Sequence, residues 1–450
     1  MRRRLAFLLA LPLAVAGSAW AQQEPPTVGI TTFVIKGHGW GHALGMGQWG
    51  ALGMARKGFG YDRILTYYYR GTQLGQAPAT SLRILLAEQK KVTVSSTAGF
   101  KVQDAARAVT DLPAGAYSIG PGFILRVDPA QPPLALQAPV TFIPGKAALA
   151  LGAARYRGRL QIQLVGKKLQ AVNVVGLDAY VRGVVTREMP KDWPLAALEA
   201  QAVAARTYAL AVRQMGAVIY ADTRSQVYGG LDAETPGGIE AVKQTKGQVV
   251  LYGGKVATTY YFSSSGGRTA GYSELFPDRP PIPYLTAVAD PYDTVSPYHN
   301  WGPVLFTAAE LSKRLHVPGV TELVPDRSGS RARQVLVTGT AGDAALPPSS
   351  VRSALGLRST WFSTGRLSLA RPVRSVASGS PVTLTGTIAR IKEPVTLEQR
   401  PAGAAWEPGP AVKPAADGTF SIQVIPAVPT QYRLVVGKVR TKALRVNVAS

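Results

Sequence analysis

The feature that most constrains this chain is the segment 176–213, GLDAYVRGVVTREMPKDWPLAALEAQAVAARTYALAVR, in which two helical patterns meet at a proline-containing turn. In the first pattern, Val181, Val184 and Glu188 follow one another at steps of three and four, which places them on one face of a helix. Pro190 disfavours the α conformation for the residue before it. The first helix is therefore predicted to end close to Glu188.

This position gives Glu188 a distinctive chemistry. Its carboxyl group is expected on the apolar face, beside the negative end of the helix dipole, and both settings are expected to raise its pKa. A carboxyl group that keeps its proton near neutral pH is what general acid catalysis requires. The structural alternative is an ion pair between Glu188 and Arg187 or Arg206. Asp178, near the start of the helix, is expected to cap it or to favour its dipole.

The second helix is predicted to start at Pro194, a residue type that suits the first turn of a helix. Gln201 and Tyr208 are separated by two helical turns and lie on roughly one face, whereas Arg206 lies on another. The predicted apolar stripe consists of Leu195, Leu198, Ala202 and Ala205. Its alanines would allow another backbone to pack closely.

The segment 37–50, GHGWGHALGMGQWG, contains too much glycine to form a stable helix from its start. It is predicted to be a loop that approaches a ligand closely, followed by a helix over residues 51–57. His38 and His42 lack the intervening glutamate and the helical context of a zinc protease motif, so no metal site is predicted. Two histidines, Gln48 and two tryptophans suit a carbohydrate groove. The alternative is a tight turn in which the tryptophans simply pack.

Residues 239–245 predict a short helix, and the Gly253-Gly254 pair after it predicts a hairpin whose second strand runs through Phe262. The hairpin leads into a serine run, but no nucleophile-elbow pattern surrounds these serines. Ser264 and Ser265 are therefore predicted to form part of a glycan-binding wall.

Strand patterns occupy two further regions. Between residues 82 and 165, short segments alternate apolar and polar side chains and are separated by proline and glycine, which predicts a β-rich lobe. Residues 371–380, RPVRSVASGS, predict a linker. Beyond it, alternation with a turn at Asp417-Gly418 predicts a small antiparallel, immunoglobulin-like sandwich. Wall adhesion, spacing and simple stabilisation are its possible uses.

The N-terminus is typical of a secretory signal. Residues 1–21 combine an arginine cluster, an apolar run and an Ala-Trp-Ala cleavage site. The apolar run is too short to span a bilayer, and no later segment is apolar for long enough. We therefore predict an extracytoplasmic protein, in the cell envelope or periplasm or secreted, without a transmembrane span in the mature chain. An uncleaved anchor and a twin-arginine route stay open.

The composition narrows the chemistry further. Fifty lysines and arginines against 26 acids give a net charge of +24. Because export makes nucleic acid a poor partner, anionic cell-envelope polymers are the predicted partners. A basic surface without a specific ligand is the alternative. The chain has no cysteine, which excludes disulfides, thiolate metal sites and a cysteine nucleophile. We predict neither a cofactor nor a metal.

The run YVRGVVTREMPKDWPLAALEAQAVAARTYAL closely resembles the signature of the SpoIID/LytB family, which comprises stage II sporulation protein D and amidase enhancers. The resemblance covers most of residues 33–365. Its further blocks are DTRSQVYGG (222–230), TKGQVVLYGGKVATTYYFSSSGGRT (245–269), PYLTAVADPYD (283–293) and GHGWGHALGMGQWGALGMARKGFGYDRILTYYYRGT (37–72).

The resemblance implies an α+β fold with a mixed helix and antiparallel-sheet core. The β-rich lobe and the C-terminal immunoglobulin-like sandwich are predicted from the strand patterns, and the sandwich lies outside the family signature. The predicted division is a signal peptide at 1–21, a permuted N-terminal segment of the core at 22–76, the lobe at 77–165, the core with the catalytic turn at 166–370, the linker at 371–380 and the sandwich at 381–450.

The order of the blocks is unusual. In most relatives the Gly-His motif follows a segment like LGLRSTWFSTG (355–365), whereas here it comes first, as in a circular permutation. Residues 33–36 are therefore expected beside residues 361–364. The loop that carries His42 and Gln48 is expected to line the same groove as Glu188. The family usually has GHGVGMSQ here, so Ala43 replaces a glycine and Gly47 a serine, a change that the loop fold should survive.

The resemblance implies a lytic transglycosylase that cleaves peptidoglycan glycan strands to 1,6-anhydro-muramoyl ends, with Glu188 as the single acid and base. The implied substrate-binding residues are His42, Gln48, Gln201, Arg206, Tyr208, Ser264 and Ser265. Some relatives carry a zinc site near the serine run, but YYFSSSGGRTAG lacks its ligands. The alternative, from the amidase enhancers, is a non-catalytic wall-binding protein that acts on a cell-wall amidase.

Overall fold

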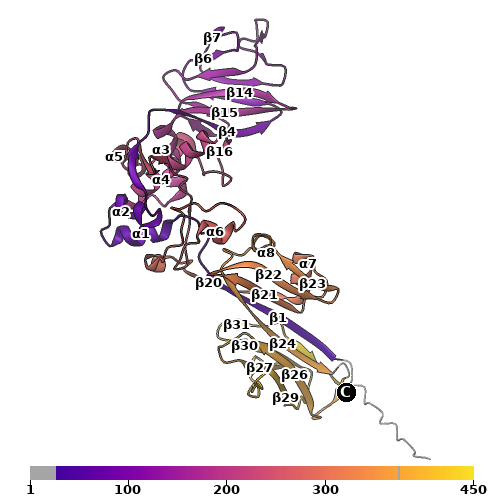
Figure 1. The fold of residues 1–450 in the computed structure, drawn as a ribbon. Coiled ribbons are helices and arrows are strands. Elements are labelled where there is room, and N and C mark those ends of the chain that lie inside the picture. The colour runs from indigo at the N-terminus through magenta and orange to yellow at the C-terminus, as the bar shows by residue number, and fades with distance from the viewer. Residues whose placement is uncertain (1–26, 373–374, 450) are drawn as a thin grey trace, which may run out of the picture. The chain divides into compact units, whose positions relative to one another are not determined.

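The computed structural model describes residues 27–372 and 375–449, so the predicted signal peptide lies outside the described residues. The described chain forms two compact units. Residues 34–364 form the larger unit, and the smaller unit combines the chain up to Phe33 with the residues from Gly365 onward. Helices and strands are both abundant, and the predicted α+β class is confirmed (Figure 1).

The helical centre of the larger unit contains the two helices predicted from segment 176–213. Helix α3 (Leu177–Glu188) ends at Glu188 because Met189, which precedes Pro190, adopts an extended conformation with φ −121° and ψ 146°. The predicted end of this helix is confirmed. Helix α4 (Leu195–Gln214) begins one residue later than predicted. The helices packed with them are α1 (Gln48–Arg56), α2 (Tyr61–Tyr68) and α5 (Pro236–Gln244).

Helix α4 does not have a single apolar stripe, and this part of the prediction is wrong. Leu195 is exposed, whereas nearly every residue from Ala197 to Val212 is buried. Elements α1, α2, α3, α5 and the strand β17 all pack against α4. Its many alanines let these elements approach from several sides, and its polar side chains are consequently buried as well.

The predicted β-rich lobe is present. Its larger sheet has the strand order β16-β4-β15-β14-β11-β6-β7 (Figure 1). A second sheet has the order β13-β12-β5-β8. The strands are β4 (Ser81–Gln89), β5 (Val92–Ser96), β6 (Phe100–Gln103), β7 (Val109–Leu112), β8 (Gly115–Ile119), β9 (Ile124–Leu125), β10 (Leu134–Ala135), β11 (Val140–Ile143), β12 (Leu149–Leu151), β13 (Ala154–Tyr156), β14 (Arg159–Val165), β15 (Lys168–Gly176) and β16 (Ile219–Tyr220). Strand β15 runs directly into α3, so the sheet fixes the start of the helix that carries Glu188.

The predicted glycine hairpin is confirmed in its turn and corrected in its second strand. Strands β17 (Gln248–Tyr252) and β18 (Lys255–Val256) pair across Gly253 and Gly254, whose φ angles of 54° and 75° suit glycine. Strand β3 (Gln73–Gln76) extends this sheet. The chain then leaves the hairpin, and β19 (Tyr261–Phe262) pairs in parallel with β2 (Met46–Gly47). The glycine-rich loop is thereby held against the serine run.

The loop itself folds as its glycines require. A Cβ atom on Gly45 would lie 2.0 Å from the carbonyl oxygen of Tyr260, and one on Gly39 would lie 2.5 Å from that of Ser264. Ala43, which replaces a glycine of the family pattern, adopts a φ of 73° and is fully buried. The loop thus keeps a conformation that costs an alanine about 1 kcal/mol.

The larger unit is completed by a three-stranded sheet and short helices. These elements are α6 (Tyr272–Leu275), β20 (Asn300–Thr307), α7 (Ala308–Leu315), β21 (Glu322–Ser328), β22 (Arg331–Gly339), β23 (Gly342–Leu346) and α8 (Pro348–Leu355), with 3₁₀ turns at Gly230–Ala233 and Pro291–Val295. None of the helices in the described residues is long and apolar enough to cross a membrane.

The predicted position of the displaced N-terminal motif is confirmed. Strand β1 (Thr27–His38) lies between β20 and β24 (Phe362–Pro372) in one sheet. Within the larger unit, the N–H of His38 donates to the carbonyl of Trp361 at 2.9 Å, and the hydroxyl of Ser363 donates to the carbonyl of Lys36 at 3.4 Å. Residues 36–38 therefore lie beside residues 361–363, which agrees with the predicted neighbourhood, and the permutation itself stays a prediction.

In the described residues, the secondary structure of the smaller unit consists of strands. Strand β24 pairs with β26 (Val382–Ala389), which pairs with β29 (Thr419–Val424). A second sheet contains β27 (Thr396–Pro401), β28 (Glu407–Pro408), β30 (Thr430–Val436), β31 (Val439–Arg440) and β32 (Leu444–Val446). Gly418, with φ 84°, forms the predicted turn. The predicted linker contains β25 (Val376–Ala377), which pairs with β33 (Val448–Ala449). The immunoglobulin class of this unit stays a prediction.

Candidate functional site

Glu188 lies half-buried at the wall of a pocket of about 350 Å³. Three segments far apart in sequence surround it, and they carry residues 40–42, 223–227 and 260–263. Tyr208 of α4 contributes a further side. His42 and Glu188 thus line one pocket, which confirms the prediction that the Gly-His loop and the end of α3 share a groove.

The carboxyl group of Glu188 is held by two donors. The backbone N–H of Val227 donates to its Oε1 at 2.6 Å, and the hydroxyl of Tyr261 also donates to it. Burial raises the pKa of Glu188, while these two hydrogen bonds act in the opposite direction. Within the described residues, Glu188 forms no salt bridge with an arginine, so the structural alternative of an ion pair is not supported.

Tyr261 is oriented by a chain of hydrogen bonds that runs back into the core. Tyr180 donates to the side-chain oxygen of Gln226 at 3.0 Å, and the amide nitrogen of Gln226 donates to the hydroxyl of Tyr261 at 2.9 Å. Because the Tyr261 oxygen accepts from Gln226, its own proton points to Glu188. Gln226 is almost fully buried. Sequence reasoning missed these residues, although Gln226 and Tyr261 lie in two of the blocks that carry the family resemblance.

Gln48 and Gln201 lie behind Glu188 rather than in the pocket. The amide of Gln48 donates to the carbonyl of Glu188 at 3.2 Å and to the side-chain oxygen of Gln201 at 3.4 Å. Gln48 is 8% exposed and Gln201 is fully buried. Direct contact of these side chains with a sugar is therefore corrected to a positioning role, since they tie the loop, α3 and α4 together at Glu188.

Arg206 is also removed from the pocket by burial. Its side chain is 0% exposed, and its Nε donates to Oδ1 of Asp178 at 2.7 Å. Its Nη1 donates to the carbonyl of Gln248 at 3.1 Å. The guanidinium therefore joins α3, α4 and β17 and cannot contact a sugar. Asp178 makes no capping hydrogen bond, although it lies in the first turn of α3, where the dipole favours an acid.

Ser264 and Ser265 do not form a wall of the pocket, because both are fully buried. They bind the buried carboxylate of Asp293, which accepts from the Ser264 hydroxyl at 2.9 and 3.0 Å and from the Ser265 N–H at 2.9 Å. The Nδ1 of His299 lies 3.0 Å from the same carboxylate. The predicted glycan contact of the two serines is thus corrected to a structural one, in which they fix the loop that faces the Gly-His motif.

His42 and Tyr208 remain at the pocket surface. The Nδ1 of His42 accepts from the N–H of Leu44 at 3.1 Å, and its other nitrogen donates to the carbonyl of Tyr261. Desolvation of the ring by the surrounding protein lowers the pKa of His42, although part of the side chain is exposed. Both ring nitrogens are thus used by the backbone, and the ring contacts Phe262. Tyr208 packs against Tyr260 with a ring separation of 5.9 Å and faces the pocket.

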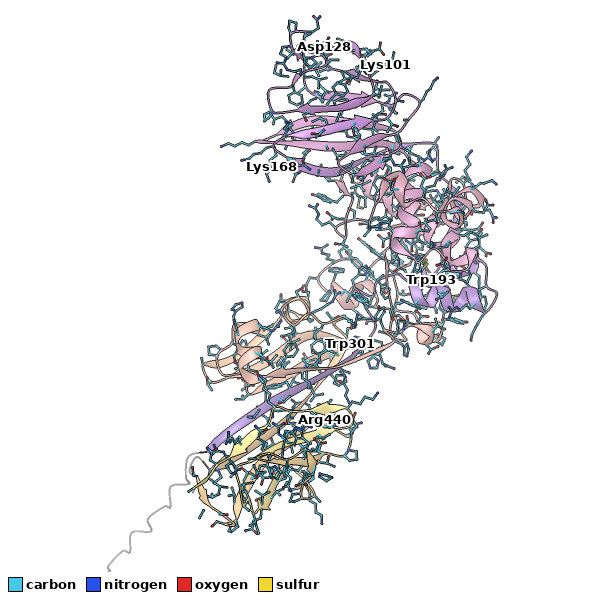
Figure 2. All side chains as sticks on the ribbon, turned by 180° about the vertical axis from the view of Figure 1, so that it is seen from behind. Lys101, Asp128, Lys168, Trp193, Trp301 and Arg440 are labelled. Carbon is cyan, nitrogen blue, oxygen red and sulfur yellow. The ribbon has the colours of Figure 1, made fainter. Side chains whose placement is uncertain are left out.

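Aromatic side chains extend from the pocket along one line of contacts. Trp40 lines the pocket, and its ring centroid lies 4.5 Å from that of Tyr298. The ring centroids of Tyr298 and Trp49 are 6.3 Å apart. Trp49 lies 5.0 Å from Trp193, which is labelled beside the helices of this unit in Figure 2. Trp40 is 38% exposed. Trp40 and Trp49 thus both pack against Tyr298, as the packing alternative expects, and the carbohydrate groove stays a prediction.

Metal ligation finds no support in this neighbourhood. Across residues 27–372 and 375–449, no group of three or more histidine, aspartate or glutamate side chains is arranged to hold a metal ion.

Comparisons with known proteins give matches that include the helices around Glu188. A family model described as SpoIID, Stage II sporulation protein, matches residues 165–252, which include α3 and α4. The amidase enhancer of Bacillus subtilis is 40% identical over 121 residues, 27% of this chain and 16% of that protein. Stage II sporulation protein D of Bacillus subtilis is 30% identical over 217 residues, 43% of this chain and 61% of that protein.

These matches place the segment 165–252 in the SpoIID/LytB family. An uncharacterised protein of Brachyspira hyodysenteriae is 35% identical over 143 residues, 31% of this chain and 38% of that protein. The chain therefore spans less than two thirds of the length of each of these relatives. No solved structure gives a significant match to it. The SpoIID-type segment is the part that delivers Glu188 to its pocket.

Proposed function

We propose that this SpoIID-family protein is an exported lytic transglycosylase that cleaves peptidoglycan glycan strands. The observation that carries the proposal is a half-buried carboxyl group with a raised pKa, Glu188, fixed at the wall of a pocket that aromatic side chains line. Glu188 is the only carboxylic acid among the residues described as lining this pocket. A glycosidase that uses water needs two carboxyl groups, whereas formation of an anhydro ring needs one.

The hydrogen bonds of Glu188 suit a single acid that acts twice. The N–H of Val227 donates to Oε1, and we assign the acid proton to Oε2. Glu188 transfers this proton to the glycosidic oxygen as the bond from the muramoyl C1 to that oxygen breaks. The resulting carboxylate then takes the proton of the muramoyl C6 hydroxyl as the oxygen of that hydroxyl bonds to C1. The 1,6-anhydro ring closes without water, and Glu188 is protonated again.

The surrounding residues supply position and an apolar environment. Gln48 and Gln201 hold the end of α3 from behind, and Tyr261 holds the carboxyl group from the side. Tyr208 and Trp40 offer rings against which a sugar packs. The proposed roles of His42 and Gln48 are to shape the loop rather than to exchange protons.

A non-catalytic role as an amidase enhancer is the second candidate. The 40% identity to the amidase enhancer of Bacillus subtilis favours it, and the net charge of +24 suits attraction to an anionic wall. In that role, the pocket would bind glycan without cleaving it, and the smaller unit would add adhesion to the wall.

Mass spectrometry separates the two candidates. Purified protein is incubated with glycan strands that carry or lack stem peptides, and anhydro-muramoyl products are sought. We expect release by the wild-type protein and none by Glu188→Gln, with binding to sacculi nearly unchanged in the variant. If the wild-type protein releases no such product but stimulates a separate amidase, the enhancer function is correct.

A further inference from the structure

We propose that Arg358 forms a carboxylate-binding subsite beside the Glu188 pocket and recognises acid groups carried by the glycan. This inference rests on the proposed glycan substrate but not on its cleavage. Neither the family match, which covers residues 165–252, nor the pocket lining includes Arg358.

The guanidinium of Arg358 lies over two aromatic rings. It lies 4.8 Å from the ring centroid of Trp40 and 4.7 Å from that of Tyr298. These two rings contact each other edge to face, with centroids 4.5 Å apart. Since Trp40 lines the Glu188 pocket, the charge of Arg358 lies at the border of that pocket.

The backbone around Arg358 is fixed to the Gly-His loop. The N–H of Gly41 donates to the carbonyl of Arg358 at 3.0 Å. The hydroxyl of Ser359 donates to the carbonyl of His38 at 2.6 Å. Because backbone and stacking both restrict the side chain before a ligand arrives, little conformational entropy is lost on binding.

The N–H groups of Arg358 are available to a ligand. The residue is partly exposed, and its side chain donates to no acceptor among the described residues. Because the two rings are nearly perpendicular, the guanidinium can stack face to face on only one of them, and its partial exposure leaves N–H groups for hydrogen bonds to a ligand. Arg224, the other arginine at this pocket, differs because Asp222 neutralises it at 2.7 Å.

A carboxylate matches this arrangement. Two parallel N–H groups of an arginine bind the two oxygens of a carboxylate with defined geometry. A muramoyl residue carries such a group on its lactyl substituent, where it is free if no peptide is attached. A stem peptide carries its own carboxylates in the same neighbourhood. The subsite is specific for the carboxylate, and the two sources are separated by experiment.

The test measures binding in the Glu188→Gln background, so that cleavage does not interfere. Three probes are compared by calorimetry: peptide-free strands, the same strands with their lactyl carboxylates converted to methylamides, and peptide-bearing strands. We expect peptide-free strands to bind about fivefold more tightly than methylamide strands, the size that a partly exposed ion pair contributes. Addition of Arg358→Gln should abolish this difference and leave methylamide binding unchanged.

Two control variants accompany it. Arg213→Gln removes an exposed charge in the last turn of α4 and should keep the fivefold preference. Arg358→Lys keeps the charge but loses the planar geometry, and it should keep a smaller preference. Circular dichroism checks that each variant is folded.

If the Glu188→Gln protein, in which Arg358 is intact, binds peptide-free and methylamide strands equally, the proposal is wrong. This comparison does not require Arg358→Gln to fold. It is also wrong if Arg358→Gln weakens both probes alike, because Arg358 then only supports Trp40. If peptide-bearing strands bind as weakly as methylamide strands, the lactyl group is the source of the carboxylate that Arg358 binds. If peptide-bearing strands bind tightly, the stem peptide is the source. Failure of the proposed cleavage would show separately, as absence of anhydro products from the wild-type protein.

Discussion

The ion pair between Asp178 and Arg206 is predicted to hold α3, and with it Glu188, in place. Arg206 is 0% exposed and Asp178 is 29% exposed, and their contact is 2.7 Å long. Removal of one partner from a buried pair costs about 3–5 kcal/mol. The partial exposure of Asp178 and the hydrogen bond that an asparagine would retain reduce this cost, so Asp178→Asn should destabilise the larger unit by about 2 kcal/mol.

Urea denaturation followed by the helical signal of circular dichroism measures this cost. The signal reports the larger unit, because the helices of the described residues lie between residues 48 and 355. Asp222→Asn is the matched control, since its contact with Arg224 has the same length but the side chains are 53% and 60% exposed. No measurable loss is expected there. If Asp178→Asn costs no more than this control, the buried pair does not hold the helix.

Three further changes test the neighbourhood of Glu188. Tyr261→Phe removes a hydrogen bond that lowers the pKa of Glu188. Since the reaction needs the protonated acid and is lost as the pH rises through this pKa, the alkaline limb of the pH–rate profile should move to higher pH. Tyr252→Phe, at an exposed tyrosine of β17, is the control and should not move this limb. An unchanged limb for Tyr261→Phe would contradict the proposed contact. Gln48→Leu should lower kcat by about tenfold with little change in KM, because it loosens the end of α3; a change in KM alone would place Gln48 in direct sugar contact instead. Gly50→Ala would stabilise an isolated helix, but here its Cβ would lie 2.0 Å from the hydroxyl of Tyr68, so we expect it to destabilise the protein by about 2 kcal/mol. Thermal unfolding shows whether the free energy of unfolding falls or rises.

The sequence predicted those features that depend on local backbone chemistry. Pro190 ended α3 at Glu188, and Gly253 with Gly254 formed the hairpin turn. Alternation predicted the strands of the lobe because one face of each strand is buried. The position of the Gly-His loop followed from the order of the family blocks, since a permuted chain has to bring the same surfaces together.

The roles of individual polar residues could not be predicted in this way. Periodicity assigns a residue to a helix face, but α4 is buried on nearly all faces, so Gln201 and Arg206 are enclosed whichever face they occupy. The contact between Gln226 and Tyr261 joins two loops that are brought together only by tertiary packing. Ser264 resembled a pocket residue in sequence because nothing local indicated that Asp293 would bind it.

The central claim is that Glu188 closes an anhydro ring without using water. The most direct measurement is cleavage of peptide-free glycan strands in water enriched in oxygen-18, with products analysed by mass spectrometry. We predict products that end in 1,6-anhydro-muramoyl residues and contain no heavy oxygen, and no products with Glu188→Gln. Reducing ends that carry oxygen-18 would show hydrolysis instead, and the absence of any product from the wild-type protein would contradict a catalytic role for Glu188.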